Sequence, residues 1–208
     1  AETNGVTCYD TFTGFKFMAE KKNALEAAGE GKVIFSYEES YGYMLGDYVR
    51  DKDAVTASML LTEMAAWYAA QGMTLFDALN ALYEKYGYYA EKTHNLVMPG
   101  LDGLRDMAEL MRKLKDEPPT EIAGTEVVVR KDYNDGTVHD CRTGAVTKME
   151  LSGSNVLRFE LSDGTTILAR PSGTEPKIKV YILARGKDAA DAAATVEKYG
   201  AWAEALKG

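Results

Sequence analysis

The sequence has few of the residues that build metal centres and disulfide frameworks. Its 208 residues include two cysteines and two histidines. Cys8 and Cys141 lie far apart and lack metal-ligand spacing, so we expect reduced thiols and a cytoplasmic location. His94 has no partner at metal-binding spacing, and we expect it to be a structural or surface residue. We therefore predict no metal site in this chain.

Long apolar runs and blocks of basic residues are also absent. No run is long enough to span a bilayer, and we expect neither a signal peptide nor a membrane partner. The 24 Lys and Arg residues are outnumbered by 32 Asp and Glu, which gives a net charge of −8 and argues against a nucleic-acid surface. No strand or helix pattern leads into Ala1, which fits a chain that belongs to a longer protein.

The segment 168–181 has the sequence Leu-Ala-Arg-Pro-Ser-Gly-Thr-Glu-Pro-Lys-Ile-Lys-Val-Tyr and predicts a strand, a polar loop and a second strand. Arg170 supplies a planar fork of donors that can engage two phosphate oxygens. Ser172 and Thr174 add hydroxyl donors, and Gly173 allows close approach of the backbone to an anion. The pattern favours a phosphate-binding loop, and a hairpin turn that contains an arginine is the alternative.

A second polar segment, 35–43, reads Phe-Ser-Tyr-Glu-Glu-Ser-Tyr-Gly-Tyr and follows a strand that we expect to be buried. In an extended loop, Glu38 and Ser40 lie on the same side, where they can hydrogen-bond neighbouring hydroxyl groups, whereas Glu39 points away. A polar surface loop is the alternative. Lys16 is expected near the N-terminus of a helix, where the helix dipole slightly disfavours a cation.

Apolar periodicity and capping residues predict an α/β partial domain at 1–72, followed by an α+β domain with a mainly antiparallel sheet at 73–208. We expect the Met and aromatic residues of the second and third helices to form core. Asp132–Gly136 suggests a calcium loop only superficially, because its glycine comes one position early and no closing glutamate follows. The expected helices are 17–28, 54–70, 74–86, 101–115 and 189–206, and the clearest expected strands are 32–35, 88–97, 157–161, 166–170 and 177–182.

Three of these segments resemble one family. Arg-Pro-Ser-Gly-Thr-Glu-Pro-Lys at 170–177 resembles the phosphate-binding loop in the last domain of the α-D-phosphohexomutases, the phosphoglucomutase and phosphomannomutase family. Segment 35–43 resembles that family's sugar-recognition loop, and Thr-Phe-Thr-Gly-Phe-Lys-Phe at 11–17 resembles the lysine-bearing segment of its third domain. The order matches, and the resemblance spans essentially the whole chain. Ser36 and Tyr37 stand where the family usually has glycine, and the Thr-Ala-Ser-His-Asn-Pro phosphoserine segment and the Asp-Gly-Asp-x-Asp metal loop are missing.

The resemblance implies a truncated third domain and a fourth domain of a mutase that interconverts hexose 1-phosphate and hexose 6-phosphate. It implies partners in the hexose phosphate and in the missing N-terminal domains of the same protein. It implies no cofactor bound by this chain, and Mg²⁺ and glucose 1,6-bisphosphate for the complete enzyme. The implied roles are Glu38 and Ser40 for sugar hydroxyls, Lys16 as a possible acid/base group, and Arg170, Ser172, Gly173, Thr174 and Lys179 for the non-transferring phosphate.

We expect the chain alone to bind substrate without turning it over. The alternative is a non-catalytic phosphosugar-binding module. The Glu-Glu-Ser-Tyr-Gly-Tyr form at 38–43 is similar to glucose-handling members of the family, and the choice between glucose and mannose stays open.

Overall fold

The computed structural model describes residues 1–46 and 48–207. The chain forms two compact units, Ala1–Asn80 and Ala81–Gly208, which are described separately. The sequence predicted a boundary between 72 and 73, whereas the units divide later, within the third helix. None of the helices in the described part of the chain combines the length and apolar character needed to cross a bilayer.

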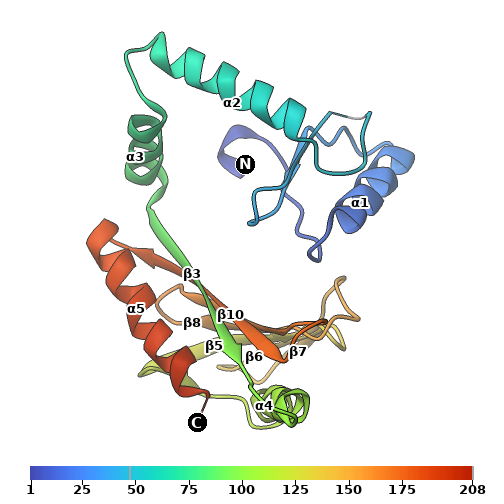
Figure 1. Cartoon of the computed structure of the whole chain (residues 1–208), viewed down its shortest axis with the longest axis vertical. Helices are drawn as coiled ribbons and strands as arrows, with labels where there is room; N and C mark the ends of the chain where they lie inside the picture. Colours follow the sequence, from blue (N-terminus) through green and yellow to red (C-terminus); the bar gives the residue numbers. More distant parts are fainter. Residues whose placement is uncertain (47, 208) are drawn as a thin grey trace. The chain divides into compact units, whose positions relative to one another are not determined.

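The first unit consists of short strands and helices (Figure 1). Its strands β1 and β2 form a two-stranded antiparallel sheet in which Tyr37 pairs with Tyr43. β1 begins at Phe35, so the strand expected at 32–35 lies later in the chain. The elements, the last of which continues into the second unit, are η1 (Glu2–Asn4), α1 (Phe15–Ala28), β1 (Phe35–Tyr37), β2 (Tyr43–Leu45), α2 (Ala54–Ala69) and α3 (Leu75–Tyr86).

Local capping explains where the helices of this unit begin and end. The Asp53 side chain accepts a hydrogen bond from Val55 N at 3.0 Å at the start of α2, as the sequence predicted. Thr74 and Asp77 form a reciprocal pair at the start of α3, in which each side chain accepts from the backbone N–H of the other. Gly29 ends α1 in the left-handed conformation, with φ of 68°.

The expectation that the Met and aromatic residues of α2 form core is wrong for this chain. No residue of α2 is buried, and Trp67 is 61% exposed. A groove of about 590 Å³ lies between α2 and the strands β1 and β2, and it is lined mainly by apolar and aromatic side chains, among them Phe35 and Met64. A helix that is apolar on most sides is normally buried. The partner that buries α2 is therefore not found within Ala1–Asn80.

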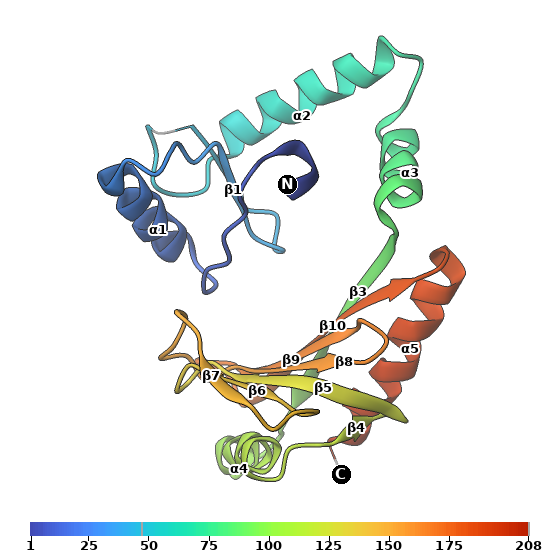
Figure 2. The ribbon, with the colours of Figure 1, turned by 180° about the vertical axis from the view of Figure 1, so that it is seen from behind.

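The second unit is an antiparallel sheet with two helices packed on it (Figure 2). The order of the main sheet is β3-β10-β9-β8-β5-β6-β7, β4 pairs with β5, and every pairing is antiparallel. This arrangement confirms the predicted fold class. The elements are β3 (Tyr88–Val97), α4 (Gly103–Asp116), β4 (Glu121–Ile122), β5 (Thr125–Asp132), β6 (Thr137–Asp140), β7 (Val146–Lys148), β8 (Leu157–Leu161), β9 (Thr166–Pro171), β10 (Lys177–Gly186) and α5 (Ala189–Ala205).

Alternation along the central strands gives the sheet two unlike faces. On β10, Ile178, Val180 and Ile182 are fully buried, and they belong to one cluster with side chains of α4 and α5. We call this side of the sheet the core face. Lys179 and Tyr181 lie on the other side, which we call the opposite face. The phosphate-loop strands thus use their apolar residues for folding and present their polar residues on the opposite face.

Candidate functional site

The loop between β9 and β10 is held at its base by backbone hydrogen bonds. Ser172 N donates to Lys177 O at 2.8 Å, and Lys177 N donates to Glu175 O at 2.8 Å. Pro176 O accepts from Met98 N at 2.8 Å, which ties the end of the loop to the residue after β3. The predicted strand–loop–strand is therefore present, and its polar tip rests on a fixed backbone frame.

Two cations stand opposite each other beside this loop. Arg170 on β9 and Lys179 on β10 are direct partners in the strand pairing, so their side chains leave the same face of the sheet. Like charges in this position destabilise a sheet. Within the described residues, no carboxylate lies within ion-pair distance of either side chain. The pair concentrates positive charge at the mouth of the loop, and the exposed Glu175 carboxylate compensates it only in part, through a longer-range attraction to Lys179.

Tyr181 orients Arg170, a role that the sequence analysis missed. Arg170 Nη2 donates to the Tyr181 hydroxyl at 3.1 Å, and its guanidinium carbon lies 5.9 Å from the centre of the tyrosine ring. Arg170 Nε is buried and has no hydrogen-bond partner among the described residues. The signal was present in the alternation of β10, because Tyr181 follows Lys179 by two residues and shares its face.

Arg158 on β8 is a second guanidinium on the opposite face. It pairs with Leu168, which in turn pairs with Tyr181, so these three residues form one row across the sheet. Arg158 lies 3.0 Å from the Glu160 carboxylate, and its Nε is buried without a partner in the part of the chain that the structure describes. The hydrogen bond to Tyr181 brings the tip of Arg170 to the same row.

The tip of the loop is open to solvent. Ser172 is half-buried, Gly173 and Thr174 are exposed, and Ser172 Oγ lies 3.4 Å from Thr174 N. A Cβ added at Gly173 would meet no atom within 4 Å, and the backbone there is outside the left-handed region. The packing of the chain therefore does not require glycine at this position. Lys177 donates to Glu175 and lowers the pKa of that carboxyl, so these two charges largely offset each other.

The segment of Glu38 and Ser40 is a tight hairpin turn between β1 and β2. Glu38 N donates to Gly42 O at 3.0 Å, Tyr41 N donates to Glu38 O at 3.2 Å, and Tyr41 has φ of 66°. The expectation of an extended loop after a buried strand is wrong, because the chain folds back at once and Tyr37 of β1 is 62% exposed. The alternation argument that placed Glu38 and Ser40 on one side therefore does not apply.

Burial nevertheless separates the two carboxylates of this turn. Glu38 is half-buried with its carboxylate beside Gly42, whereas Glu39 and Ser40 are exposed. Gly42 is itself buried, and an added Cβ would lie 2.7 Å from the Phe15 ring. Absence of a side chain at Gly42 thus lets the turn pack against α1.

Lys16 lies in the first turn of α1, next to Phe15. Its side chain is exposed, and Nζ lies 4.6 Å from the centre of the Phe17 ring. No hydrogen bond or ion pair joins Lys16 to Glu38 or Ser40 among the described residues. Packing of Phe15 on Gly42 links the helix to the turn, whereas the exposed Lys16 side chain lies over the Phe17 ring.

Comparisons with known proteins identify both units. The sequence model of phosphoglucomutase/phosphomannomutase, alpha/beta/alpha domain III, matches residues 1–86. The model of the phosphoglucomutase/phosphomannomutase C-terminal domain matches residues 95–198. The chain belongs to the phosphoglucomutase/phosphomannomutase family. It corresponds to the C-terminal portion of these proteins, as the sequence analysis predicted.

Similar proteins of the family are longer. Phosphoglucomutase of Staphylococcus aureus RF122 is 36% identical over 182 residues, which cover 88% of this chain and 32% of the relative. The N315 strain enzyme is 35% identical over 193 residues, covering 93% of this chain and 34% of the relative. The chain thus spans about a third of the length of these relatives.

A solved structure agrees in fold. It is the open form of the exocytosis-sensitive phosphoprotein pp63/parafusin, a phosphoglucomutase from Paramecium. The TM-score is 0.62 at 20% identity, and the match covers 99% of this chain and 35% of that one. At this identity the likeness supports the fold alone.

The family implies magnesium, and the donor set of this chain does not fit it. Across residues 1–46 and 48–207, no group of three or more His, Cys, Asp or Glu side chains is arranged to hold a metal ion.

Proposed function

We propose that this chain is the substrate-binding C-terminal part of a phosphohexomutase that interconverts hexose 1-phosphate and hexose 6-phosphate. In this proposal the β9–β10 loop binds the phosphate that is not being transferred, through Arg170, Ser172, Gly173, Thr174 and Lys179. Glu38 and Ser40 bind hydroxyl groups of the sugar, and Lys16 is a candidate acid/base group. Cys8 and Cys141 have free thiols, which are typical of a reducing compartment, so the proposal includes a cytoplasmic location.

The observation that carries the proposal is the Arg170–Lys179 pair, for which the described residues provide no ion-pair partner. Two cations opposed across a strand pair cost stability, and a phosphate dianion placed between them reverses the sign of that interaction. The orphaned Arg170 Nε and the hydroxyls of Ser172 and Thr174 supply donors beside the same position. Gly173 leaves its backbone accessible, although nothing in the chain's own packing requires a glycine there.

Binding at the unreactive end of a substrate is a useful division of labour. Contacts to the phosphate that stays in place orient the sugar, so that the reacting end meets the catalytic groups in a productive geometry. Those groups, together with magnesium and the glucose 1,6-bisphosphate intermediate, belong in this proposal to the rest of the complete enzyme. The exposed apolar side of α2 supports a longer protein, because a larger α/β domain would cover it.

Isothermal titration of the chain with glucose 6-phosphate tests the phosphate site. We expect weak binding that Arg170→Ala abolishes. Arg185→Ala is the matched control, because Arg185 lies on the same face of β10 but roughly 20 Å along the strand from Lys179. Equal affinity of wild type and Arg170→Ala, or equal losses in both variants, contradicts the assignment.

The turn in the first unit has its own test. In the complete enzyme, Glu38→Gln should lower turnover more than Glu39→Gln, because Glu38 is half-buried and the Glu39 side chain is exposed. A larger effect of Glu39→Gln would place the sugar contacts elsewhere in the turn.

A turnover assay separates this function from that of a binding module. The purified chain is incubated with glucose 1-phosphate, magnesium and glucose 1,6-bisphosphate, and glucose 6-phosphate formation is followed. We expect none, because phosphoryl transfer needs a nucleophile and groups that stabilise the transferring oxygens. Turnover that follows the chain through purification and disappears in Arg170→Ala would refute the division of roles. If the uncut coding sequence lacks the phosphoserine and metal segments, the protein is a phosphosugar-binding module.

A further inference from the structure

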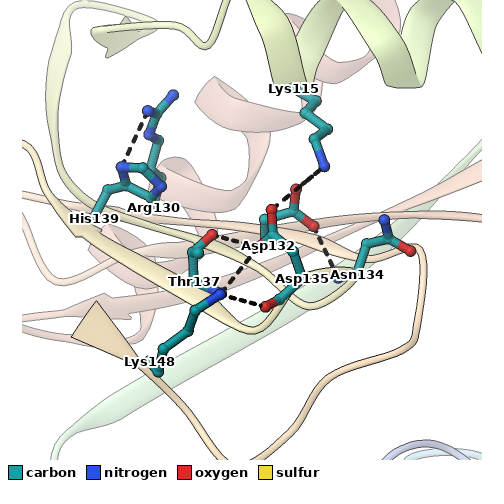
Figure 3. Close-up of polar contacts among 8 residues, drawn as sticks. All are labelled: Lys115, Arg130, Asp132, Asn134, Asp135, Thr137, His139 and Lys148. Atoms are coloured by element: carbon teal, nitrogen blue, oxygen red, sulfur yellow. Dashed lines mark hydrogen bonds and ion pairs between the residues drawn. The ribbon is translucent and has the colours of Figure 1, made fainter. Parts of the chain in front are cut away.

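A second cavity, which is lined largely by polar side chains, lies on the core face between the end of α4 and the strands β5 and β6. Its volume is about 190 Å³, and Leu157 and Phe159 of β8 form part of its wall. Arg130 on β5 is the strand partner of both Phe159 on β8 and His139 on β6. Arg130 and His139 therefore lie on the core face, in the same row as the buried Phe159. Figure 3 shows the Lys115 side chain extending from α4 toward Asp132 and Asp135. The phosphate loop presents its side chains on the opposite face, so this cavity is a separate feature.

Arg130 faces this cavity without an anionic partner. Its Nη2 lies 3.2 Å from His139 Nδ1, and Figure 3 shows the two side chains pointing together. Because a guanidinium can only donate, Nδ1 is the acceptor of this hydrogen bond, and the ring proton then lies on Nε2. Within residues 1–46 and 48–207, no carboxylate lies within ion-pair distance of Arg130. Arg130 is half-buried, so its guanidinium loses part of its hydration without an ion pair to replace it.

The carboxylates around the cavity, in contrast, have cationic partners. Lys115 Nζ lies 2.6 Å from the buried Asp132 carboxylate, which raises the pKa of the lysine, and 3.7 Å from Asp135. Asp116 pairs with Arg112 at 3.3 Å. Among the charged side chains that line the cavity, Arg130 is therefore the one without an ion pair in the described residues, and Lys115 and Arg130 together balance the charges of Asp132 and Asp135.

Size and charge restrict what the cavity can take. Its volume corresponds to roughly six water molecules and lies below that of pockets for drug-sized ligands. The planar fork of Arg130 matches a carboxylate, and Leu157 and Phe159 offer apolar surface to a short hydrocarbon body. A second negative charge would be repelled by Asp132 and Asp135, which share one lysine.

We propose that this cavity binds a small organic monocarboxylate, whose carboxylate pairs with Arg130 and the Nε2–H of His139. The site is independent of the phosphate loop and of the mutase function proposed above.

Titration of the whole ¹⁵N-labelled chain with sodium butyrate, followed by amide shifts in two-dimensional NMR, tests the proposal. We expect saturable shifts centred on β5 and β6 with a Kd of roughly 1–10 mM, the range set by so few ligand atoms. Butyramide, the neutral isostere, should bind at least tenfold more weakly. Equal binding of butyrate and butyramide, or no saturable shift with butyrate, overturns the proposal.

Variants locate the site. Arg130→Gln should abolish saturable binding, and Arg105→Gln is the matched control, because Arg105 is an exposed arginine at the other end of α4. His139→Phe keeps a ring but removes both nitrogen atoms, and it should lower butyrate affinity at least threefold. If Arg130→Gln fails to fold, the butyrate affinity of His139→Phe tests the site instead. Unchanged affinity in a folded Arg130→Gln or His139→Phe, or loss of butyrate binding in Arg170→Ala, refutes the site.

Discussion

Gly103 determines how closely α4 approaches the end of the phosphate loop. It is the first residue of α4 and is buried. A Cβ at this position would lie 2.1 Å from Met98 O and 3.1 Å from Pro176 Cβ. The φ of Gly103 is outside the left-handed region, so alanine can adopt the backbone conformation. The expected destabilisation by Gly103→Ala is therefore purely steric. Gly103→Ala thus tests one contact, that between α4 and the frame of the loop.

The expected loss of stability in Gly103→Ala depends on which atom the added Cβ would overlap. Met98 O belongs to the backbone, and Met98 N donates to Pro176 O, so neither side can yield by a rotamer change. Relief requires separation by roughly 1 Å, and such overpacking costs about 2–3 kcal/mol. The gain in helix propensity from alanine is at most about 1 kcal/mol. We expect a net loss of about 2 kcal/mol in the free energy of unfolding of the second unit.

Thermal unfolding measured by tryptophan fluorescence gives a clean readout. Trp67 lies in the first unit and Trp202 packs against the core of the second, so a Trp67→Phe background reports on the second unit alone. In that background Gly103→Ala should lower Tm by about 8 °C, at about 4 °C per kcal/mol for a unit of this size. A change below about 1 °C would show that the backbone absorbs the collision and would refute the reasoning.

Gly173→Ala is the matched control for this experiment. Its Cβ meets nothing within 4 Å and its φ is ordinary, so we expect a change in unfolding free energy within about 0.5 kcal/mol. If the loop binds phosphate through close backbone approach, the same variant should still bind glucose 6-phosphate several-fold more weakly. A stability loss equal to that of Gly103→Ala would mean that glycine content alone explains both results.

Further predictions concern hydrogen bonds of the two units. Tyr199→Phe should destabilise the second unit by about 1.5 kcal/mol in urea unfolding, because the fully buried phenol donates to the Asp163 carboxylate. Burial, followed by that carboxylate, raises the pKa of Tyr199 to about 12, so its contribution is present below about pH 10 and is lost as pH rises toward 12. Stability measured against pH should therefore lose this alkaline step in Tyr199→Phe. Tyr181→Phe should weaken glucose 6-phosphate binding about fivefold by calorimetry without changing charge, because Arg170 loses the hydroxyl that orients it, and unchanged affinity would contradict that role. Asp53→Ala should cost α2 about 1 kcal/mol, seen as reduced helicity by circular dichroism near neutral pH.

Local signals account for the parts of the fold that the sequence predicted. The β8–β9 hairpin follows from alternating strands that flank Asp163 and Gly164, and the pairing of Leu157 with Ala169 confirms it. The starts of α2 at Asp53 and of α3 at Thr74 also depend on local signals, because a capping side chain bonds to a backbone N–H of the first helical turn. In each case the deciding interaction spans only a few residues.

The features that the sequence did not predict depend on distant residues. The turn at Glu38 is tight because Gly42 packs on the Phe15 ring, a contact that no local pattern encodes. The apolar pattern of α2 predicted burial, whereas no residue of α2 is buried and no part of Ala1–Asn80 covers Trp67. Proximity of Arg130 and His139 required the pairing of β5 with β6, which the sequence analysis left unspecified.

The β9–β10 loop is where several local rules of stability fail together. Arg170 and Lys179 oppose each other although like charges destabilise a strand pair, and the buried Arg170 Nε finds no hydrogen-bond partner in residues 1–46 and 48–207. Gly173 adds the conformational-entropy cost of a glycine, although a Cβ at this position would meet no atom within 4 Å. Each departure alone has little meaning, because folded chains tolerate single violations. Their coincidence in one loop is what functional sites produce, since a ligand that supplies negative charge and acceptors resolves the charge repulsion and the missing hydrogen bond at once. The same reasoning predicts that phosphate raises the stability of the second unit in wild type and leaves that of Arg170→Ala unchanged.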